Sequence, residues 1–110
     1  VAMYAAIGRI ITGDIVGGKA LLVEKHGTTA IDDDILRFAF YEGKMFSELV
    51  DSAKAGVENS PQNPQSHLIL VQAYILAGRL AEARTELQAT LTAFPETATA
   101  AAPFSKQLGL

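Results

Sequence analysis

AYILAGRLAEA, residues 73–83, is the stretch of sequence that decides the fold of this chain. An apolar run ends at Gly78, and a second helical pattern begins at Leu80. Glycine accepts the left-handed backbone conformation in which many helices end, so Gly78 predicts a tight reversal between two helices. Because a small residue lets two helix axes approach, we expect Ala83 to lie where the second helix crosses the first, near Val71.

The residues on both sides of this turn have helical periodicity. Apolar side chains recur with a period near 3.6 before Gly78, which predicts a helix over residues 64–78. Pro64 suits the first turn of that helix, where its missing N–H is not needed. A second apolar stripe predicts a helix over residues 79–94, and Pro95 ends it. The two helices together form an antiparallel hairpin.

The same pattern occurs 34 residues earlier in the chain. The pairs that match in type are Pro61 and Pro95, Val57 and Leu91, Ala55 and Ala89, Glu48 and Glu82, Phe46 and Leu80, Phe40 and Tyr74, and Leu36 and Leu70. This register predicts another hairpin, with helices over 32–43 and 44–59, and a turn at the connector SPQNP.

The two ends of the chain extend this pattern. Residues 3–27 predict one more hairpin, which turns at Gly13 and Asp14 and is about three residues shorter than the period. Residues 97–110 predict a final helix that Pro103 kinks or restarts. We therefore expect an all-α domain of about three stacked antiparallel helix hairpins. Its parts are a degenerate hairpin (1–29), two repeats (30–63 and 64–97) and a C-terminal capping helix or tail (98–110).

The second unit resembles a tetratricopeptide repeat, and the resemblance implies a right-handed α-solenoid. The spacing typical of that family is met by His67, Leu70, Val71, Tyr74, Ala83, Leu87 and Pro95, with His67 in place of an aromatic residue and Val71 in place of a small one. The preceding unit matches through Leu36, Phe40, Leu49, Ala53 and Pro61. Arg37 stands there where a small residue is expected, and Gly43 comes one place early. Its first helix could therefore be rotated, or its turn could be one residue longer.

This resemblance also implies a function. Stacked hairpins of the family form a concave groove, lined by their first helices, which holds a peptide or helix of a partner protein. Carried over residue by residue, the groove is expected to be lined by Asp34, Phe38, Tyr41, Leu68, Gln72 and Ile75. This mainly apolar lining suits an amphipathic helix or an apolar segment better than a charged tail. The lysines and asparagines with which one branch of the family grips a terminal carboxylate are absent from these positions.

A structural role is the alternative to the binding module. The chain begins with Val rather than Met, and we expect it to be a piece of a longer protein. It would then be a helical-repeat segment of a larger enzyme or membrane-assembly protein, without a ligand of its own. In either case an exposed apolar end of the stack could pair with a second copy, which makes a homo-oligomer a further expectation.

Composition argues against several other classes of partner. The net charge is −3 and the nine basic residues are scattered, so no basic face is expected to bind nucleic acid. Charged residues interrupt every long apolar window, so no direct membrane insertion is expected. The chain has no cysteine, which leaves the compartment, cytoplasm or periplasm, open for a protein that we expect to be soluble.

The sequence also lacks a recognisable catalytic constellation. Three consecutive helical side chains point in different directions, so we interpret Asp32, Asp33 and Asp34 as caps of a helix start rather than as metal ligands or an acid–base pair. His26 and His67 have no second histidine or cysteine at metal-ligand spacing, and His67 is expected at a partly buried packing position. We therefore predict no enzymatic activity, no metal and no cofactor.

Overall fold

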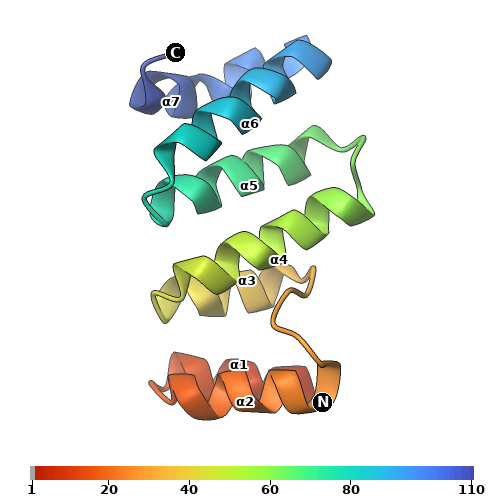
Figure 1. Cartoon of the computed structure of the whole chain (residues 1–110), viewed down its shortest axis with the longest axis vertical. Helices are drawn as coiled ribbons and strands as arrows, with labels where there is room; N and C mark the ends of the chain where they lie inside the picture. Colours follow the sequence, from red (N-terminus) through yellow and green to blue (C-terminus); the bar gives the residue numbers. More distant parts are fainter. Residues whose placement is uncertain (1) are drawn as a thin grey trace.

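The computed structural model describes residues 2–110, which form seven α-helices and one short 3-10 helix, with no strand in that range. The helices are α1 (Ala2–Ile11), α2 (Ile15–His26), α3 (Asp34–Glu42), α4 (Phe46–Asn59), α5 (Pro64–Leu76), α6 (Leu80–Ala93) and α7 (Ala98–Leu108), and the 3-10 helix η1 (Pro95–Thr97) precedes α7. Successive helices lie across the long axis of a molecule that measures 40 × 24 × 19 Å (Figure 1). The predicted all-α stack of helix hairpins is confirmed.

The three hairpin turns are built with the same backbone hydrogen bonds. Between α5 and α6, the N–H groups of residues 77, 78 and 79 donate to the carbonyls of residues 73, 75 and 74. The same three bonds recur in the α3–α4 turn and in the α1–α2 turn. The left-handed residue of each turn is Gly13, Lys44 and Gly78, with φ of 100°, 55° and 74°. The reversals predicted at Gly13 and Gly78 are therefore present, and the first hairpin is three residues out of the 34-residue register.

The α3–α4 turn explains why its glycine stands one place early. Gly43 has an ordinary φ of −81°, and the left-handed conformation falls on Lys44 instead. A Cβ atom on Gly43 would lie 2.9 Å from Ile10 Cγ2 and 2.9 Å from Ile15 Cδ1. Gly43 is therefore needed for the close approach of the first hairpin, and the turn is not one residue longer than its counterpart.

One hydrophobic core runs through the stack. It includes Leu22 of the first hairpin, Phe40 and Val50 of the second, and Leu87 of the third, all of which are almost completely buried. Val71 and Ala83 are both fully buried, as the predicted crossing of α5 and α6 requires. The division of the chain into the units 1–29, 30–63, 64–97 and 98–110 remains a prediction.

The last helix covers the end of the third hairpin. Ala101 and Leu108 of α7 are buried, and Arg84 of α6 donates from Nε to the carbonyl of Leu108 at 2.9 Å. The helix does not restart at Pro103, because α7 continues from Ala98 to Leu108 with Pro103 inside it. Pro103 is exposed, so its ring is accommodated on the solvent side.

Within residues 2–110, none of the helices has the length and apolar character needed to cross a membrane.

Candidate functional site

A hollow of about 290 Å³ lies between α3 and α5. Its walls are formed by Asp34, Arg37, Phe38 and Tyr41 of α3 and by Ile69, Gln72, Ala73 and Leu76 of α5, and Leu49 of α4 completes the lining. The start of each wall helix is fixed by a side-chain cap. Asp33 accepts a hydrogen bond from the N–H of Leu36 at 2.8 Å, and Asn63 accepts one from the N–H of Gln65 at 3.0 Å.

Four of the six side chains predicted to line a groove meet in this hollow. Asp34, Phe38 and Tyr41 line one wall, and Gln72 lines the other. Leu68 instead belongs to the core, with 5% of its surface exposed, and Ile75 is partly buried against the core outside the hollow. Whether the lining residues bind a partner remains a prediction.

The neighbouring residues Ile69 and Leu76, and the charged Arg37, line the hollow although the sequence analysis did not assign them to it. The apolar residues of α5 lie all around the helix, because positions 68–71 are Leu, Ile, Leu and Val. Periodicity therefore could not distinguish the core side of α5 from its exposed side. The only signal for Arg37 was its departure from the small residue expected at that position.

Two aromatic side chains dominate the apolar surface of the hollow. Phe38 is 54% exposed and Tyr41 is 49% exposed, whereas Leu36 and Phe40 of the same helix are fully buried. Contiguous exposed apolar surface on a folded domain marks an interaction site more often than chance would. Phe38 and Tyr41 therefore give the hollow an exposed apolar surface.

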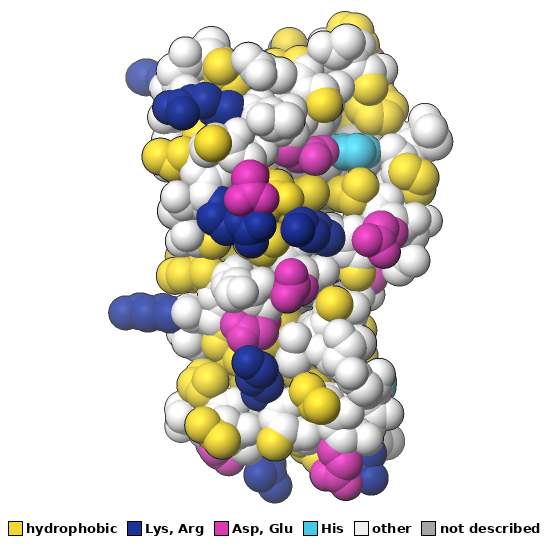
Figure 2. All heavy atoms as spheres, viewed as in Figure 1, with side chains coloured by type: hydrophobic (Ala, Val, Ile, Leu, Met, Phe, Trp, Pro, Cys, Tyr) yellow, Lys and Arg dark blue, Asp and Glu magenta, His cyan; other side chains and the backbone are white. Residues whose placement is uncertain are grey.

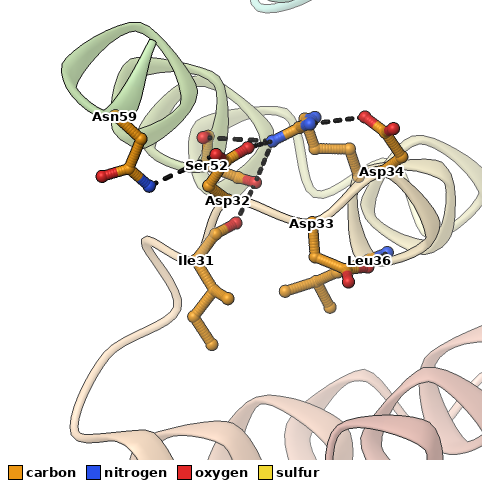
Figure 3. A network of polar contacts seen from close by, with 8 residues as sticks. Ile31, Asp32, Asp33, Asp34, Leu36, Ser52 and Asn59 are labelled. Atoms are coloured by element: carbon orange, nitrogen blue, oxygen red, sulfur yellow. Dashed lines mark hydrogen bonds and ion pairs between the residues drawn. The ribbon is translucent and has the colours of Figure 1, made fainter.

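A network of polar contacts borders the hollow at the start of α3 (Figure 3). The guanidinium of Arg37 donates from Nη1 to Asp32 Oδ1 at 3.0 Å and from Nη2 to Asp34 Oδ1 at 2.5 Å. Nη1 also lies 3.4 Å from the carbonyl and from Oγ of Ser52 in α4, and Ser52 Oγ donates to the carbonyl of Ile31. These contacts tie the α2–α3 connector to both helices of the second hairpin.

The electrostatics of this network centre on Asp32. Burial alone would raise the pKa of Asp32, but hydrogen bonds from Arg37 and from Asn59 Nδ2, at 3.2 Å, outweigh that effect and hold the pKa below its usual value. The carboxylate is therefore the stable form. A Cβ atom on Gly56 would lie only 3.1 Å from Asp32 Oδ1, so glycine leaves the space that this carboxylate occupies.

The acidic triplet differs in one respect from its interpretation as helix caps. Only Asp33 caps α3, whereas Asp32 and Asp34 converge on the same guanidinium. They converge because Asp32 precedes the helix and is separated from Asp34 by the extended backbone of Asp33, so the helical angle between successive side chains does not apply. Among the residues that the structure describes, no group of three or more acidic or histidine side chains is arranged to hold a metal ion.

His67 occupies the partly buried position expected for it. Its Nδ1 lies 2.7 Å from Glu86 Oε2, its Nε2 lies 2.8 Å from the carbonyl of Pro61, and its ring centroid lies 5.7 Å from that of Phe94. Burial alone would lower the pKa of His67, but the bonds to Glu86 and Pro61 raise it above its usual value. His67 therefore joins the α4–α5 connector to α6.

The face formed mainly by α2, α4 and α6 has a different character. Figure 2 shows that acidic and basic side chains lie next to one another across its middle. The ion pairs include Lys19 with Glu48 at 3.3 Å and Arg79 with Glu82 at 2.7 Å, and Arg79 also lies 5.0 Å from the ring centroid of Tyr74. Charges of both signs are interspersed on this face, unlike the extended basic patch that phosphate binding requires.

The arrangement of turns, helix pairs and core defines the chain as a helical-repeat protein built from hairpins. The family model described as "Tetratricopeptide repeat" matches residues 51–103, from the second half of α4 to the first half of α7. This match supports the predicted resemblance of the segment to the tetratricopeptide repeat family. Repeats of this family are typically modules for protein–protein interaction. Searches of curated proteins and of solved structures found no match.

Proposed function

We propose that this chain is a protein-binding module that holds a peptide or a helix of a partner protein in the hollow between α3 and α5. The observation that carries the proposal is the exposure of Phe38 and Tyr41 beside the apolar walls Ile69 and Leu76. Removing apolar surface from water is favourable by roughly 25 cal/mol for each Å². A partner that covers Phe38 and Tyr41 removes their apolar surface from water, and this burial favours binding.

The size of the hollow supports a partner that inserts side chains. Its volume of about 290 Å³ is at the lower limit of sites that enclose a small molecule, which begin near roughly 300 Å³. It is large enough for one or two apolar side chains of a helix or peptide lying across α3 and α5. Helices that bind in grooves insert apolar side chains that are three, four or seven positions apart. Phe38 and Tyr41 are three positions apart on α3, so two such side chains of a partner helix can contact one ring each.

A displayed library of random peptides tests this proposal. The peptides should have about 15 residues, enough for four helical turns. The chain should enrich peptides with apolar anchors, and Phe38→Ala should weaken binding of a selected peptide roughly tenfold, because a buried aromatic contact is worth more than about 1 kcal/mol. The matched control is Val16→Ala, since Val16 is 81% exposed on α2 and lies outside the hollow.

The outcomes of this experiment separate the alternatives. Equal binding to the wild-type chain and to the Phe38→Ala variant would show that the hollow is not the binding surface. Failure of the wild-type chain to enrich any peptide would overturn the proposal of a peptide-binding module.

A self-associating structural segment is the second candidate, and the first hairpin is the observation that favours it. The large apolar side chains Tyr4, Ile11, Val16 and Val23 are 68%, 51%, 81% and 47% exposed on α1 and α2. If these helices pair with a second copy, sedimentation velocity should show a dimer that dissociates in the Val16→Glu variant. A sedimentation coefficient of the monomer at every concentration from low to high micromolar would exclude this candidate.

A further inference from the structure

We propose that the segment bound between α3 and α5 carries a basic side chain, lysine or arginine, that pairs with Asp34. The inference rests on the proposed function, because it specifies the chemistry of the partner in the same hollow. It is carried by the charges at the start of α3 and by the way in which the structure uses each of them.

Negative charge is in excess at this end of the hollow. The start of α3 carries three carboxylates and one guanidinium: Asp32 and Asp34 pair with Arg37, and the carboxylate of Asp33 is directed to the N–H of Leu36 (Figure 3). The start of a helix contributes roughly half a positive charge, which does not balance the remaining two carboxylates. A cation that approaches α3 from this end is therefore attracted.

Of the three carboxylates, Asp34 is the one that a partner can reach. Asp32 uses Oδ1 for Arg37 and Oδ2 for Asn59, and Asp33 accepts the N–H of Leu36. The side chain of Asp34 is 87% exposed. Its Oδ1 accepts from Arg37, and within residues 2–110 no hydrogen bond reaches its Oδ2. The second oxygen of Asp34 thus faces solvent at the edge of the hollow.

An acidic partner group finds no corresponding cation. Asp34 and Arg37 are the charged residues in the lining of the hollow. The side chain of Arg37 is only 11% exposed, and its Nη atoms are directed to Asp32, Asp34 and Ser52. A partner carboxylate would meet Asp34 before it reached this guanidinium. The arrangement therefore discriminates against acidic segments as well as favouring basic ones.

The spacing along α3 gives the position of the basic residue in the partner. Asp34, Phe38 and Tyr41 are four and seven residues apart on one stripe of the helix. At 1.5 Å of rise per residue, the aromatic rings lie about 6 Å and 10 Å along the axis from the carboxylate. A lysine or arginine at Asp34 can extend its aliphatic part over Phe38, where the ring face also attracts the cation. In a helical partner, the basic residue should therefore precede or follow an apolar anchor by one or two turns.

The random-peptide library also tests this inference when the Asp34→Asn variant is used beside the wild-type chain. Asparagine keeps an acceptor for Arg37 but removes the charge. The wild-type chain should enrich peptides with lysine or arginine three, four or seven positions from an apolar residue, and the variant should lose that preference. A peptide selected on the wild-type chain should bind the variant about two- to fivefold more weakly, the usual effect of an exposed ion pair.

Two controls assign this effect to the pair. Glu42→Gln removes an exposed carboxylate from the same helix, outside the hollow, and should leave affinity unchanged. Replacing the basic residue of the peptide by glutamine should abolish the difference between the wild-type chain and the Asp34→Asn variant. Peptides that depend on Phe38 but show no basic preference would overturn this inference and leave the proposed function standing. Absence of any enriched peptide would overturn both.

Discussion

The hairpins α3–α4 and α5–α6 have the same turn and a different interior. Their turns use the same three backbone hydrogen bonds, 34 residues apart. At equivalent positions inside the hairpins, Val71 of α5 is a fully buried apolar residue, whereas Arg37 of α3 is a charged residue held by Asp32, Asp34 and Ser52. α5 and α6 also contact each other over a longer stretch than α3 and α4 do.

The comparison separates two parts of a repeat. Backbone hydrogen bonds fix the turn, whereas the interior side chain can be apolar in one repeat and charged in the next. The turn bonds determine the reversal, and they form whether the left-handed residue is Gly78 or Lys44. The interior position accepts either a small apolar side chain or a charged one, provided that its polar atoms are satisfied. No buried side-chain nitrogen or oxygen among the described residues lacks a hydrogen-bond partner. The α3–α4 hairpin is therefore the one with a charged interior residue, Arg37, and the polar network around this residue borders the hollow.

Replacing Arg37 should produce the largest loss of stability and should remove the main difference between the hairpins. Arg37→Met removes the donor of the buried Ser52 and leaves Asp32 with only its bond from Asn59, which we expect to lower the free energy of unfolding by about 3 kcal/mol. Urea unfolding followed by circular dichroism measures this. Arg9→Met is the control, because Arg9 pairs with Asp14 at the surface, where both side chains are more than half exposed. Equal stability of the two variants would show that the polar network is not a structural requirement.

Enlarging the crossing residue of the other hairpin should have the next largest effect. Ala83 is fully buried, so Ala83→Leu should overpack the contact between α5 and α6 and destabilise the chain by about 1–3 kcal/mol. The melting temperature should fall, whereas Ala81→Leu, at an exposed position of the same helix, should leave it nearly unchanged. A wild-type melting temperature for Ala83→Leu would place Ala83 away from the crossing.

Moving the glycine of the α3–α4 turn should sharpen the comparison of the two turns. Lys44 is a non-glycine residue in the left-handed conformation, which is unfavourable by roughly 1–2 kcal/mol in the folded chain. Lys44→Gly removes this strain, but glycine also gives the unfolded chain more conformational entropy. We therefore expect the free energy of unfolding to rise by about 0.5 kcal/mol. Gly43→Ala should instead destabilise by about 1 kcal/mol, because its Cβ meets Ile10 and Ile15. Melting temperatures that change in the same direction would contradict the separate roles of Gly43 and Lys44.

The pH dependence of His67 should give the smallest effect, below about 1 kcal/mol for a partly exposed pair. Both ring nitrogens face acceptors, Glu86 and the Pro61 carbonyl, so both donate only when the ring is protonated. The pKa of His67 is raised in the folded chain, so its stabilising contribution is complete below the unfolded pKa, near about 6.5, and is lost as pH rises through the folded value.

Thermal unfolding at two pH values, one on each side of this range, measures the contribution of His67. The wild-type chain should lose more stability on going to the higher pH than the His67→Gln variant does. An identical pH dependence of the two chains would mean that the His67–Glu86 contact does not stabilise the protonated ring.

Much of the fold follows from the sequence because its signals are local. The periodicity of apolar residues gives the helices, Gly13 and Gly78 give two of the reversals, and the interval of 34 residues gives the third. Gly43 shows the limit of such signals. Gly43 is needed for packing, because Ile10 and Ile15 of another hairpin approach it closely. These contacts join residues 28 and 33 positions apart, so no local sequence pattern predicts them.

The candidate site was predicted less completely than the fold. Phe38 and Tyr41 were assigned through the resemblance to the repeat family, and both do line the hollow, while Leu36 and Phe40 lie on the buried side of α3. Leu68 was carried over in the same way as the counterpart of Asp34, but it is buried, and Ile69 lines the hollow instead. The polar network was missed because it depends on Arg37 reaching Ser52, 15 residues away on another helix.

The contact at Gly43 also bears on how the chain opens. A second hollow of about 660 Å³ lies between α2 and the start of α4, where the ion pair of Lys19 with Glu48 connects them, so the first hairpin packs against the rest mainly through α1, α3 and the tight approach at Gly43. Segments with fewer packed contacts open at lower free energy than the whole domain. Amide hydrogens of α1 and α2 should therefore exchange with deuterium before those of α4, α5 and α6, and the chain would behave as two cooperative units of unequal lifetime.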